Sequence, residues 1–595
     1  MTIGESDNSE EDKDFVLKEP KRKKRKKDLV TLTVSRKKLA KDTALTSKRH
    51  KIGVVAQRDM LANLINVGGG DIRDFSISAK TVRTSGAKAV KEAAIDAKKD
   101  FKRVLKEDLA GRKSIIVHFD GKSQAQFHDK IKSVKKRLSI IASSPDLPSE
   151  QLLGVPITPS NSGKHQKEVV TEALKDWGVV PHILGLGFDT TSDNTGKNKG
   201  AVVLIEKALN EAVWWVACPH HYYEIHIKKV ARFYFGESSS PEETTFKKLK
   251  DSWNDIIEKR INYENLEFFD WEKWEGTFLA DQAREVMEYM KSLLKTNTFP
   301  REDMRELLNL VLVWLGVKLE KFKFQYPGAM SHARFLMQSI YSVKIFLLSK
   351  QLGIYSAEEL DQIKNVAMFV GLFHSSWYFK SCLASSAPML HLQTLKQMEK
   401  LKVLLPELAM VVLNSIQLHL WYLTPQGIPL SLVDESLSDD ARSWIAVGIF
   451  STPRPTVHLL GKPSFPDLSS WPTAKWLSDQ VPELSSLLGP DSWLLFNKLG
   501  LGDEDLEWLQ MDPKTWDIMP GYQGFRDFVR KLTIVNDPAE RGVGLVKQFI
   551  ATYQNEDSCQ DNLIAVSEHR KLVKKDSKKE VLAKVGLQKK SWQIK

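Results

Sequence analysis

Two stretches of the sequence combine a nearly unbroken run of apolar residues with an aspartate at the carboxyl end. Residues 114–120 read Ser-Ile-Ile-Val-His-Phe-Asp and end at Asp120, and residues 181–189 read Pro-His-Ile-Leu-Gly-Leu-Gly-Phe-Asp and end at Asp189. Apolar runs of this length are typical of buried strands. A carboxylate at the carboxyl end of such a strand projects into the crevice above a sheet, so each run predicts a strand that carries an acid into a site.

Strands and helices alternate around these two runs, over residues 111–235. The pattern predicts strands over 114–120, 137–142, 152–157, 181–189 and 213–217, and helices from Ser160 or Asn161 to Trp177, over 196–210 and over 220–233. Several α/β folds alternate in this way. The order agrees best with a ribonuclease H-like fold, because that topology makes the first and fourth strands, which carry the two aspartates, neighbours.

A third acidic residue, Glu540, lies far downstream in Asn-Asp-Pro-Ala-Glu-Arg-Gly-Val-Gly-Leu, residues 536–545. This segment predicts a helix with Asp537 as its cap and Pro538 as its first residue. Two divalent ions that share three carboxylates can activate the attacking oxygen and stabilise the leaving oxygen of a phosphodiester. We therefore expect a catalytic, metal-binding triad in which Asp120 bridges two Mg²⁺ or Mn²⁺ ions, Asp189 holds one and Glu540 the other. Asp193 and Asp537 compete for the same role.

Between these acids, residues 236–530 show helical spacing and no comparable series of strands. Examples are the apolar residues over 307–319, 335–352 and 395–423. The fold class we expect is an α/β ribonuclease H-like core, a mixed sheet flanked by helices, interrupted by a large all-helical insertion domain with its own core. The first part of the core would be 111–235, and residues 531–570 would add the final core helix with the third acid.

Both ends of the chain are strongly basic. Residues 18–51 hold 15 basic and three acidic side chains, and residues 571–595 are also rich in lysine. The tails over 1–52 and 571–595 have little to bury, so we expect them to be disordered. An unbroken basic heptamer matches a nuclear-localisation signal, which predicts a nuclear protein with an import receptor as partner. Its residues are Lys21, Arg22, Lys23, Lys24, Arg25, Lys26 and Lys27.

Residues 53–110 are predicted to be helical. A first helix runs from Val54 to Ile65, a glycine-rich turn follows, and a second helix starts near Ser78. Lys80, Arg83 and Lys88 on the second helix predict a helix-turn-helix that reads DNA. Gly86 interrupts that helix, however, and two connecting helices on the body of the protein explain the pattern equally well.

The chain holds three cysteines, widely separated, which excludes a disulfide framework and a cysteine-rich zinc finger. Cys218 and His221 have the spacing of a zinc pair, but two ligands do not make a zinc site. No apolar run reaches the roughly 18 residues of a membrane span, and no signal peptide is evident. We expect a soluble intracellular protein that does not bind membranes.

Four motifs together resemble the DDE transposases of the hAT-like group. They are Phe-Asp120-Gly-Lys-Ser, Gly-Phe-Asp189-Thr-Thr-Ser-Asp-Asn194-Thr-Gly, Cys218-Pro-His-His221-Tyr-Tyr-Glu and Ala-Glu540-Arg541-Gly. The resemblance spans about residues 110 to 570. It implies cleavage and strand transfer of DNA on a Mg²⁺- or Mn²⁺-dependent site, usually by an oligomer. It also implies that Asn194, Cys218, His221 and Arg541 form the active-site wall or position DNA.

The chain departs from that group in three ways. It has no BED-type finger, since residues 1–110 lack cysteine; an extra acid, Asp193, precedes Asn194; and the last motif reads Ala-Glu-Arg-Gly, where the family often has Ser-Glu-Arg and an aromatic residue.

Two other functions stay open. The chain could be a domesticated, non-catalytic DNA-binding or scaffold protein on the same fold, or a helical protein-interaction protein whose apparent strands are core helices.

Overall fold

The computed structural model of the 595-residue chain describes residues 34–128, 131–236, 244–258, 261–296, 299, 301–320, 322–326, 336–467, 482–539, 542, 545 and 556–572. The chain divides into two compact units. The smaller unit is Met1–Ala89 with His569–Lys595, and the larger is Val90–Glu568. Within the described ranges, no helix is both long and apolar enough to span a lipid bilayer.

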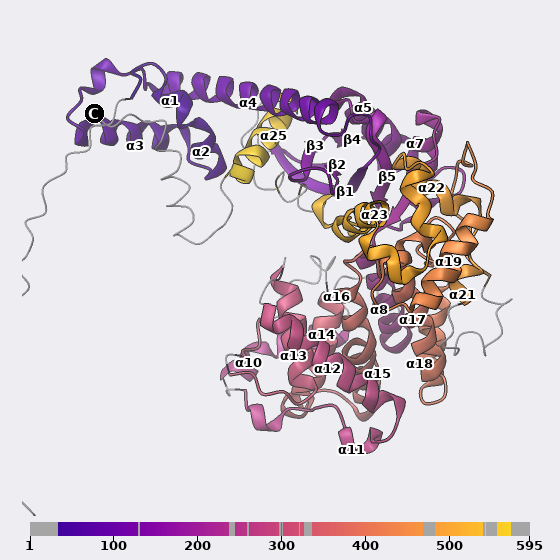
Figure 1. Cartoon of the computed structure of the whole chain (residues 1–595). Helices are drawn as coiled ribbons and strands as arrows, with labels where there is room; N and C mark the ends of the chain where they lie inside the picture. The colour runs from indigo at the N-terminus through magenta and orange to yellow at the C-terminus, as the bar shows by residue number, and fades with distance from the viewer. Residues whose placement is uncertain are drawn as a thin grey trace, which may run out of the picture. The chain divides into compact units, whose positions relative to one another are not determined.

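The larger unit contains a mixed sheet of six strands (Figure 1). The strands are β1 (Ile115–His128), β2 (Ile131–Ser143), β3 (Gln151–Gly154), β4 (Ile157–Thr158), β5 (Ile183–Phe188) and β6 (Trp214–Ala217). Their order is β3-β2-β1-β5-β6, with β4 beside β2. β2 is antiparallel to β1, β3 and β4, whereas β5 is parallel to both β1 and β6. The predicted mixed sheet is confirmed, and the reading of these strands as core helices is wrong.

Two strands differ from the prediction. β1 does not end at Asp120 but continues to His128, because it pairs with β2 beyond the point where its parallel pairing with β5 stops. The single strand expected over 152–157 is divided into β3 and β4, which both pair with β2. Pro156 lies at the division, and a proline has no N–H group to donate to a neighbouring strand.

The two faces of β2 are covered by different elements, because successive side chains of a strand point to opposite faces. Leu138, Ile140 and Ala142 lie in the main core, which includes apolar residues of α5 (Gly163–Trp177). Ile141 instead packs in a small cluster that includes Leu563 of α25 (Glu556–Leu572). The sheet therefore has helices on both faces, and one of them comes from the far end of the unit.

A glycine in β5 makes room for a buried histidine of the neighbouring strand. A Cβ atom at Gly187 would overlap the imidazole of His118. That ring is fully buried and hydrogen-bonds the Ser143 hydroxyl at 2.8 Å. Gly187 and His118 are the last pair in the parallel register of β1 and β5, so the close approach of the two strands is decided here.

Residues 244–531 are mainly helical, and α8 (Pro219–Phe235) leads into them from the sheet. The longer helices are α12 (Phe278–Thr296), α13 (Glu302–Trp314), α14 (Met337–Leu352), α15 (Ala357–Phe369), α17 (Ala387–Leu401), α18 (Pro406–Ile416), α19 (Asp439–Ser451) and α23 (Pro520–Lys531). The apolar stretch over 395–423 forms two helices, since Pro406 starts a new one. The expected separate core is not seen: the buried apolar residues of the sheet and of these helices form one cluster.

The smaller unit has a core of its own, formed by Leu39, Ala40, Leu61, Ile65, Ile77 and Val82. Its helices are α1 (Leu39–Asp42), α2 (Ala44–Arg49), α3 (Val54–Val67) and the start of α4 (Ala79–Glu107). Ser78 caps α4 as predicted, because its hydroxyl accepts from the Thr81 N–H at 3.1 Å. The prediction that Gly86 interrupts this helix is wrong. α4 passes through it, and a Cβ atom there would meet only Ala44 of α2, at 4.0 Å.

Candidate active site

The register of the two central strands places the first two acids side by side. The parallel pairing of β1 and β5 ends at His118 and Gly187. Asp120 lies two residues further along β1, and Asp189 directly follows the end of β5, two residues after Gly187. Both aspartates line one cavity of about 190 Å³. The predicted juxtaposition of the two acids is therefore seen, although Asp120 lies within its strand and not at the end of it.

The carboxylate of Asp189 is held by its own loop. Oδ1 accepts from the Thr191 hydroxyl at 2.7 Å, from the Thr191 N–H at 3.3 Å and from the Asn194 amide at 2.5 Å. The Asn194 amide also donates to the Asp189 carbonyl at 3.2 Å. All hydrogen bonds of this carboxylate within the described residues thus fall on Oδ1. Asn194, predicted for the wall of the site, orients Asp189, while Asp193 is exposed and takes no part.

A segment from the end of the larger unit returns to the same cavity. The Asn536 side chain donates from Nδ2 to the carbonyl of Phe119, the residue before Asp120, at 2.9 Å. The Asn536 N–H donates to the Cys218 sulfur at 3.2 Å, and Cys218 follows directly after β6. The helical turn starts at 537, so Asn536 and not Asp537 precedes it. One residue thereby links the ends of two strands to the segment that carries the third acid.

Glu540 and Arg541 lie outside the described residues, but their neighbours on both sides are placed. Ala539 is fully buried, and Gly542 touches β2, since a Cβ atom at Gly542 would overlap the Ser139 hydroxyl. Ser139 is the residue that pairs with Asp120. Leu545 packs in the cluster of Ile141 and α25. The chain before Glu540 therefore contacts β1, which bears Asp120, and the chain after it contacts β2, the neighbour of β1. The convergence of all three acids stays a prediction.

Two cationic side chains share the cavity with the aspartates. His220 Nδ1 lies 3.0 Å from Asp537 Oδ1, and Arg301 at the start of α13 lies 3.7 Å from Asp537 Oδ2. Burial by itself lowers the pKa of His220, but the charge and the hydrogen bond of Asp537, together with the contact with Cys382, outweigh it and raise the pKa to about 10. His220 is therefore an imidazolium at neutral pH. Asp537, considered above as a competing metal ligand, is instead the counter-ion of His220 and Arg301.

Both cations are fixed in position. The His220 ring stacks on Tyr378 with a centroid distance of 4.0 Å, and Nε2 lies 3.4 Å from the Cys382 sulfur. Arg301 makes a two-pronged contact with Asp303 at 3.0 and 2.9 Å and donates to the Tyr378 hydroxyl at 3.2 Å. Burial opposes the charged guanidinium, but Tyr378, Asp303 and Asp537 together raise the pKa of Arg301 above its usual value. The site thus sets two fixed positive charges, both paired with Asp537, beside the carboxylates of Asp120, Asp189 and Glu224.

The structure brings together most of the predicted site residues. Asp120, Asp189, Cys218 and His221 line the cavity, and Asn194 lies behind Asp189. Sequence reasoning did not assign His220, Glu224, Arg301 or Asn536 to its wall, and it considered Asp537 only as a competing metal ligand. His220 and Glu224 had a signal, because they belong to the Cys218-Pro-His-His motif. Arg301 had none, because nothing in a helical segment marks the one residue that reaches a distant sheet.

The remaining candidate residues lie in the smaller unit and outside the described residues. Lys80, Arg83 and Lys88 are exposed on α4, and no acidic residue occurs between Ala79 and Lys91. The basic heptamer of residues 21–27 lies outside the described residues. Among the residues that are described, which do not include Glu540, no group of three or more His, Cys, Asp and Glu side chains is arranged to hold a metal.

Comparison with known proteins gives no family for this chain. It matches no protein-family model, and none of the curated proteins is similar enough in sequence to count as a relative.

The packing of Gly542 on Ser139 can be tested. Gly542→Ala should destabilise the fold by about 1–3 kcal/mol, because the added methyl group overlaps a buried hydroxyl in a packed core. The free energy of unfolding, from urea titration, measures the loss. Ser139→Ala removes that hydroxyl, which has no hydrogen-bond partner among the described residues, and should restore part of the stability in the double variant. Equal losses in the single and double variants would contradict the contact.

Proposed function

We propose that this protein is a transposase-like nuclease that binds DNA and carries out metal-dependent phosphodiester cleavage and strand transfer. One observation carries the proposal: Asp120 in β1 and Asp189, directly after the neighbouring parallel strand β5, line one cavity to which the segment that precedes Glu540 returns. In the proposal Glu540 joins these two acids, and the three act together. In the proposal the active protein is a homo-oligomer, as the resemblance to hAT-like transposases implies.

The topology supports a ribonuclease H-like core with an insertion. The first three strands in the chain are antiparallel neighbours in the order β3-β2-β1. β5 and β6 follow in parallel on the other side of β1. This is the arrangement we expected from the first and fourth strands. In the proposal, residues 236–530 form the helical insertion, which starts after α8 and ends before the segment that contains Asn536.

The donor set suits hard divalent cations. Asp120, Asp189 and Glu540 would hold Mg²⁺ or Mn²⁺, which would lower the pKa of an attacking water or hydroxyl and stabilise the leaving oxygen. Asp189 is oriented through Oδ1 alone, which leaves Oδ2 for a ligand. In cleavage, the attacking oxygen forms a bond to phosphorus as the bond to the leaving 3′ oxygen breaks. In strand transfer, a 3′ hydroxyl replaces the water.

The two cations would act on the phosphate. A phosphodiester carries a negative charge that the aspartates repel, and fixed guanidinium and imidazolium groups offset this repulsion. Arg301 and His220 both line the cavity, and both are held rigidly by Asp303, Asp537 and Tyr378. They would therefore hold the scissile phosphate over the carboxylates without a reorganisation cost at the moment of reaction.

The catalytic proposal is tested with Asp120→Asn and Asp189→Asn. Each should reduce the rate of Mg²⁺-dependent nicking of labelled duplex DNA by more than about 100-fold. Loss of a residue that only hydrogen-bonds to a metal ligand costs up to roughly 100-fold, and loss of the ligand itself should cost more. DNA binding, measured separately by anisotropy, should stay equal or become tighter, because a negative charge beside the phosphate is lost. Asp193→Asn, the same change on an exposed neighbour, is the control and should nick as the parent does.

The outcome distinguishes this function from its rivals. Normal nicking by Asp120→Asn would show that the catalytic assignment is wrong. A parent protein that binds DNA but nicks with neither Mg²⁺ nor Mn²⁺ would instead be a non-catalytic DNA-binding protein on the same fold.

We further propose that the exposed basic side of α4 binds DNA phosphates. Each Lys or Arg that neutralises a phosphate releases counterions, so log affinity falls with log salt by roughly 0.9 per contact. Replacing Lys80, Arg83 and Lys88 with Gln should therefore reduce that slope by about 2–3. The matched control replaces Lys99, Lys102 and Lys106, exposed on the same helix, and should leave the slope nearly unchanged. If both triple variants reduce the slope equally, the effect comes from the total charge of the protein and not from contacts of Lys80, Arg83 and Lys88 with phosphates.

We also propose that the protein acts in the nucleus and that an import receptor binds residues 21–27. Replacing the seven basic residues of this segment with Ala removes the charge that such a receptor recognises. A fluorescent fusion of the full chain should then lose its nuclear accumulation, whereas seven Ala substitutions at basic residues between 574 and 595 should not abolish it. If the variant at residues 21–27 still accumulates in nuclei, another segment of the chain carries the import signal.

A further inference from the structure

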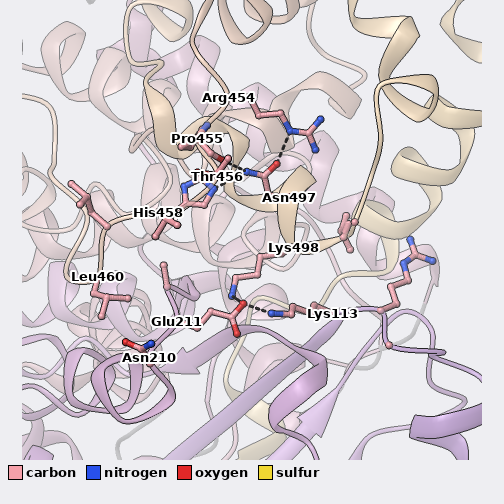
Figure 2. Close-up of a pocket in the computed structure, with 17 residues that line it drawn as sticks. Lys113, Asn210, Glu211, Arg454, Pro455, Thr456, His458, Leu460, Asn497 and Lys498 are labelled. Carbon is pink, nitrogen blue, oxygen red and sulfur yellow. Dashed lines mark hydrogen bonds and ion pairs between the residues drawn. The ribbon is translucent and has the colours of Figure 1, made fainter.

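A second cavity, of about 1020 Å³, lies at the other end of the parallel strands (Figure 2). Arg112 and Lys113 line it just before β1, and Glu211 lines it just before β6, whereas the aspartates lie where β1 and β5 stop pairing. The opposite wall comes from residues 454–460 and from the end of α22 (Leu494–Lys498). This cavity is therefore distinct from the candidate active site.

The floor of the cavity is cationic. Figure 2 shows the amino groups of Lys113 and Lys498 meeting at the single carboxylate of Glu211, and Lys498 Nζ lies 2.7 Å from Oε1. Arg112 and Arg454 also line the cavity, and Glu211 is the one acidic side chain among its described lining residues. Arg112 also lies 3.8 Å from Asp146, and Arg454 lies 3.3 Å from Asp503. The two lysines share one carboxylate, so the floor keeps an excess of positive charge that favours a negatively charged occupant.

One wall is a segment outside any helix or strand, residues 456–460, which bends at Thr456 and Val457 and has unused backbone groups. It is named here the strap. Within the described residues, the backbone N–H and C=O groups of the strap make no hydrogen bond. Pro453 and Pro455 precede it and Pro463 follows it, and prolines have no N–H to offer. Unpaired backbone N–H and C=O groups outside any sheet can pair with those of another strand.

The strap is nevertheless held at both ends and in the middle. Arg454 donates to Asn497 Oδ1 at 2.7 Å and to the Leu501 carbonyl at 2.6 Å, and the Gly461 N–H donates to the buried Glu206 carboxylate at 2.9 Å. His458 lies 3.1 Å from Asp491 Oδ1 and 3.0 Å from the Asn497 amide. Because these contacts fix the strap, a second strand could bind it without first ordering it.

One side chain of the strap faces inward, and the other four are exposed. His458 is turned inward to its partners, whereas Val457 and Leu459 on either side of it are 81% and 87% exposed. Leu460 is also exposed. Two large apolar side chains almost entirely in water, on one edge of a fixed segment, mark a surface that gains free energy when it is covered.

We propose that the strap binds an extended peptide segment of a partner protein, in which apolar side chains alternate with acidic ones. The peptide backbone pairs with the strap as an added β-strand, its apolar side chains cover Val457 and Leu459, and its carboxylates face Arg112 and Lys113. Such strand addition gives affinity through the main chain and specificity through alternate side chains. A nucleotide or nucleic acid fits less well, because no Phe, Tyr or Trp lines the cavity, the His458 ring is already held by Asp491 and Asn497, and the exposed apolar side chains would stay uncovered.

A displayed library of randomised peptides of about ten residues, selected on the full-length protein, tests this directly. The enriched sequences should alternate Asp or Glu with Leu, Ile or Val. The strongest binder is then synthesised and its affinity measured by fluorescence anisotropy. Leu459→Asp should weaken it by about tenfold or more, because it puts a charge against an apolar contact and beside acidic side chains. Val447→Asp, the same kind of change at a residue 55% exposed on α19 and outside the cavity, should have no effect.

Two further variants separate backbone pairing from charge. Leu459→Pro removes one N–H donor of the strap and should weaken binding more than Leu459→Ala, which keeps it. Lys113→Gln should weaken binding and reduce its dependence on salt. The proposal is overturned if the enriched peptides lack the alternation, if Leu459→Asp binds them as well as the parent does, or if single-stranded DNA competes for the strap with equal effect. Association of the parent with itself through the strap, abolished by Leu459→Asp, would assign the site to a second copy and overturn the partner assignment.

Discussion

The parallel pairing of β1 with β5 is the contact on which the candidate site depends. Only four residues of β1 pair with β5, because β1 then continues alone into its long antiparallel pairing with β2. The pairing stops just before two aspartates, one within β1 and one directly after β5. Gly187 permits the close approach at that point by leaving room for the His118 ring. A shift of one residue in this register would turn one carboxylate to the opposite face of the sheet and separate the pair.

The end of the larger unit completes this arrangement through polar contacts over long sequence distances. Asn536 bonds the backbone of β1, and Arg137 of β2 makes a two-pronged ion pair with Glu556 of α25 at 2.7 and 2.8 Å. The Gln560 side chain accepts from the Val155 N–H at 2.8 Å and donates to its carbonyl at 2.9 Å, at the break between β3 and β4. A buried arginine is tolerated only with such a partner. These contacts hold the chain on both sides of Glu540 to the sheet, which is why a distant acid is a credible third member of the site.

The two ends of the parallel strands differ in charge and in the elements around them. At one end, carboxylates share a cavity with His220 and Arg301, and a phosphate is the group that both sets of charges can hold. At the other end, lysines surround one glutamate beneath an apolar strap, which suits an acidic and apolar peptide. The sheet separates the two sites, so the chemistry proposed for one and the partner proposed for the other use different surfaces of the same unit.

Much of the larger unit could be predicted from local pattern, because strands and helices depend on neighbours in the sequence. The five apolar runs, the helix before β5 and the cap at Ser78 all follow from periodicity and turn chemistry. Asp120 and Asp189 were recognisable as site residues because each follows an apolar run. The end of β1 was not predictable, since it depends on how far β2 continues to pair with it. Nor was the division of the third strand, although Pro156 was its signal.

The sequence alone determined the strands, the order in which they alternate with helices and the acids they carry, because these depend on residues close together in the chain. Only the tertiary structure decided that Arg301 reaches the acids, that Asp537 serves as a counter-ion and that Asn536 bonds Phe119, since these contacts join residues more than a hundred positions apart. The strap, too, is visible only in three dimensions. Its apolar residues look like core in the sequence, and only the folded chain shows them exposed on a segment whose backbone groups have no partner.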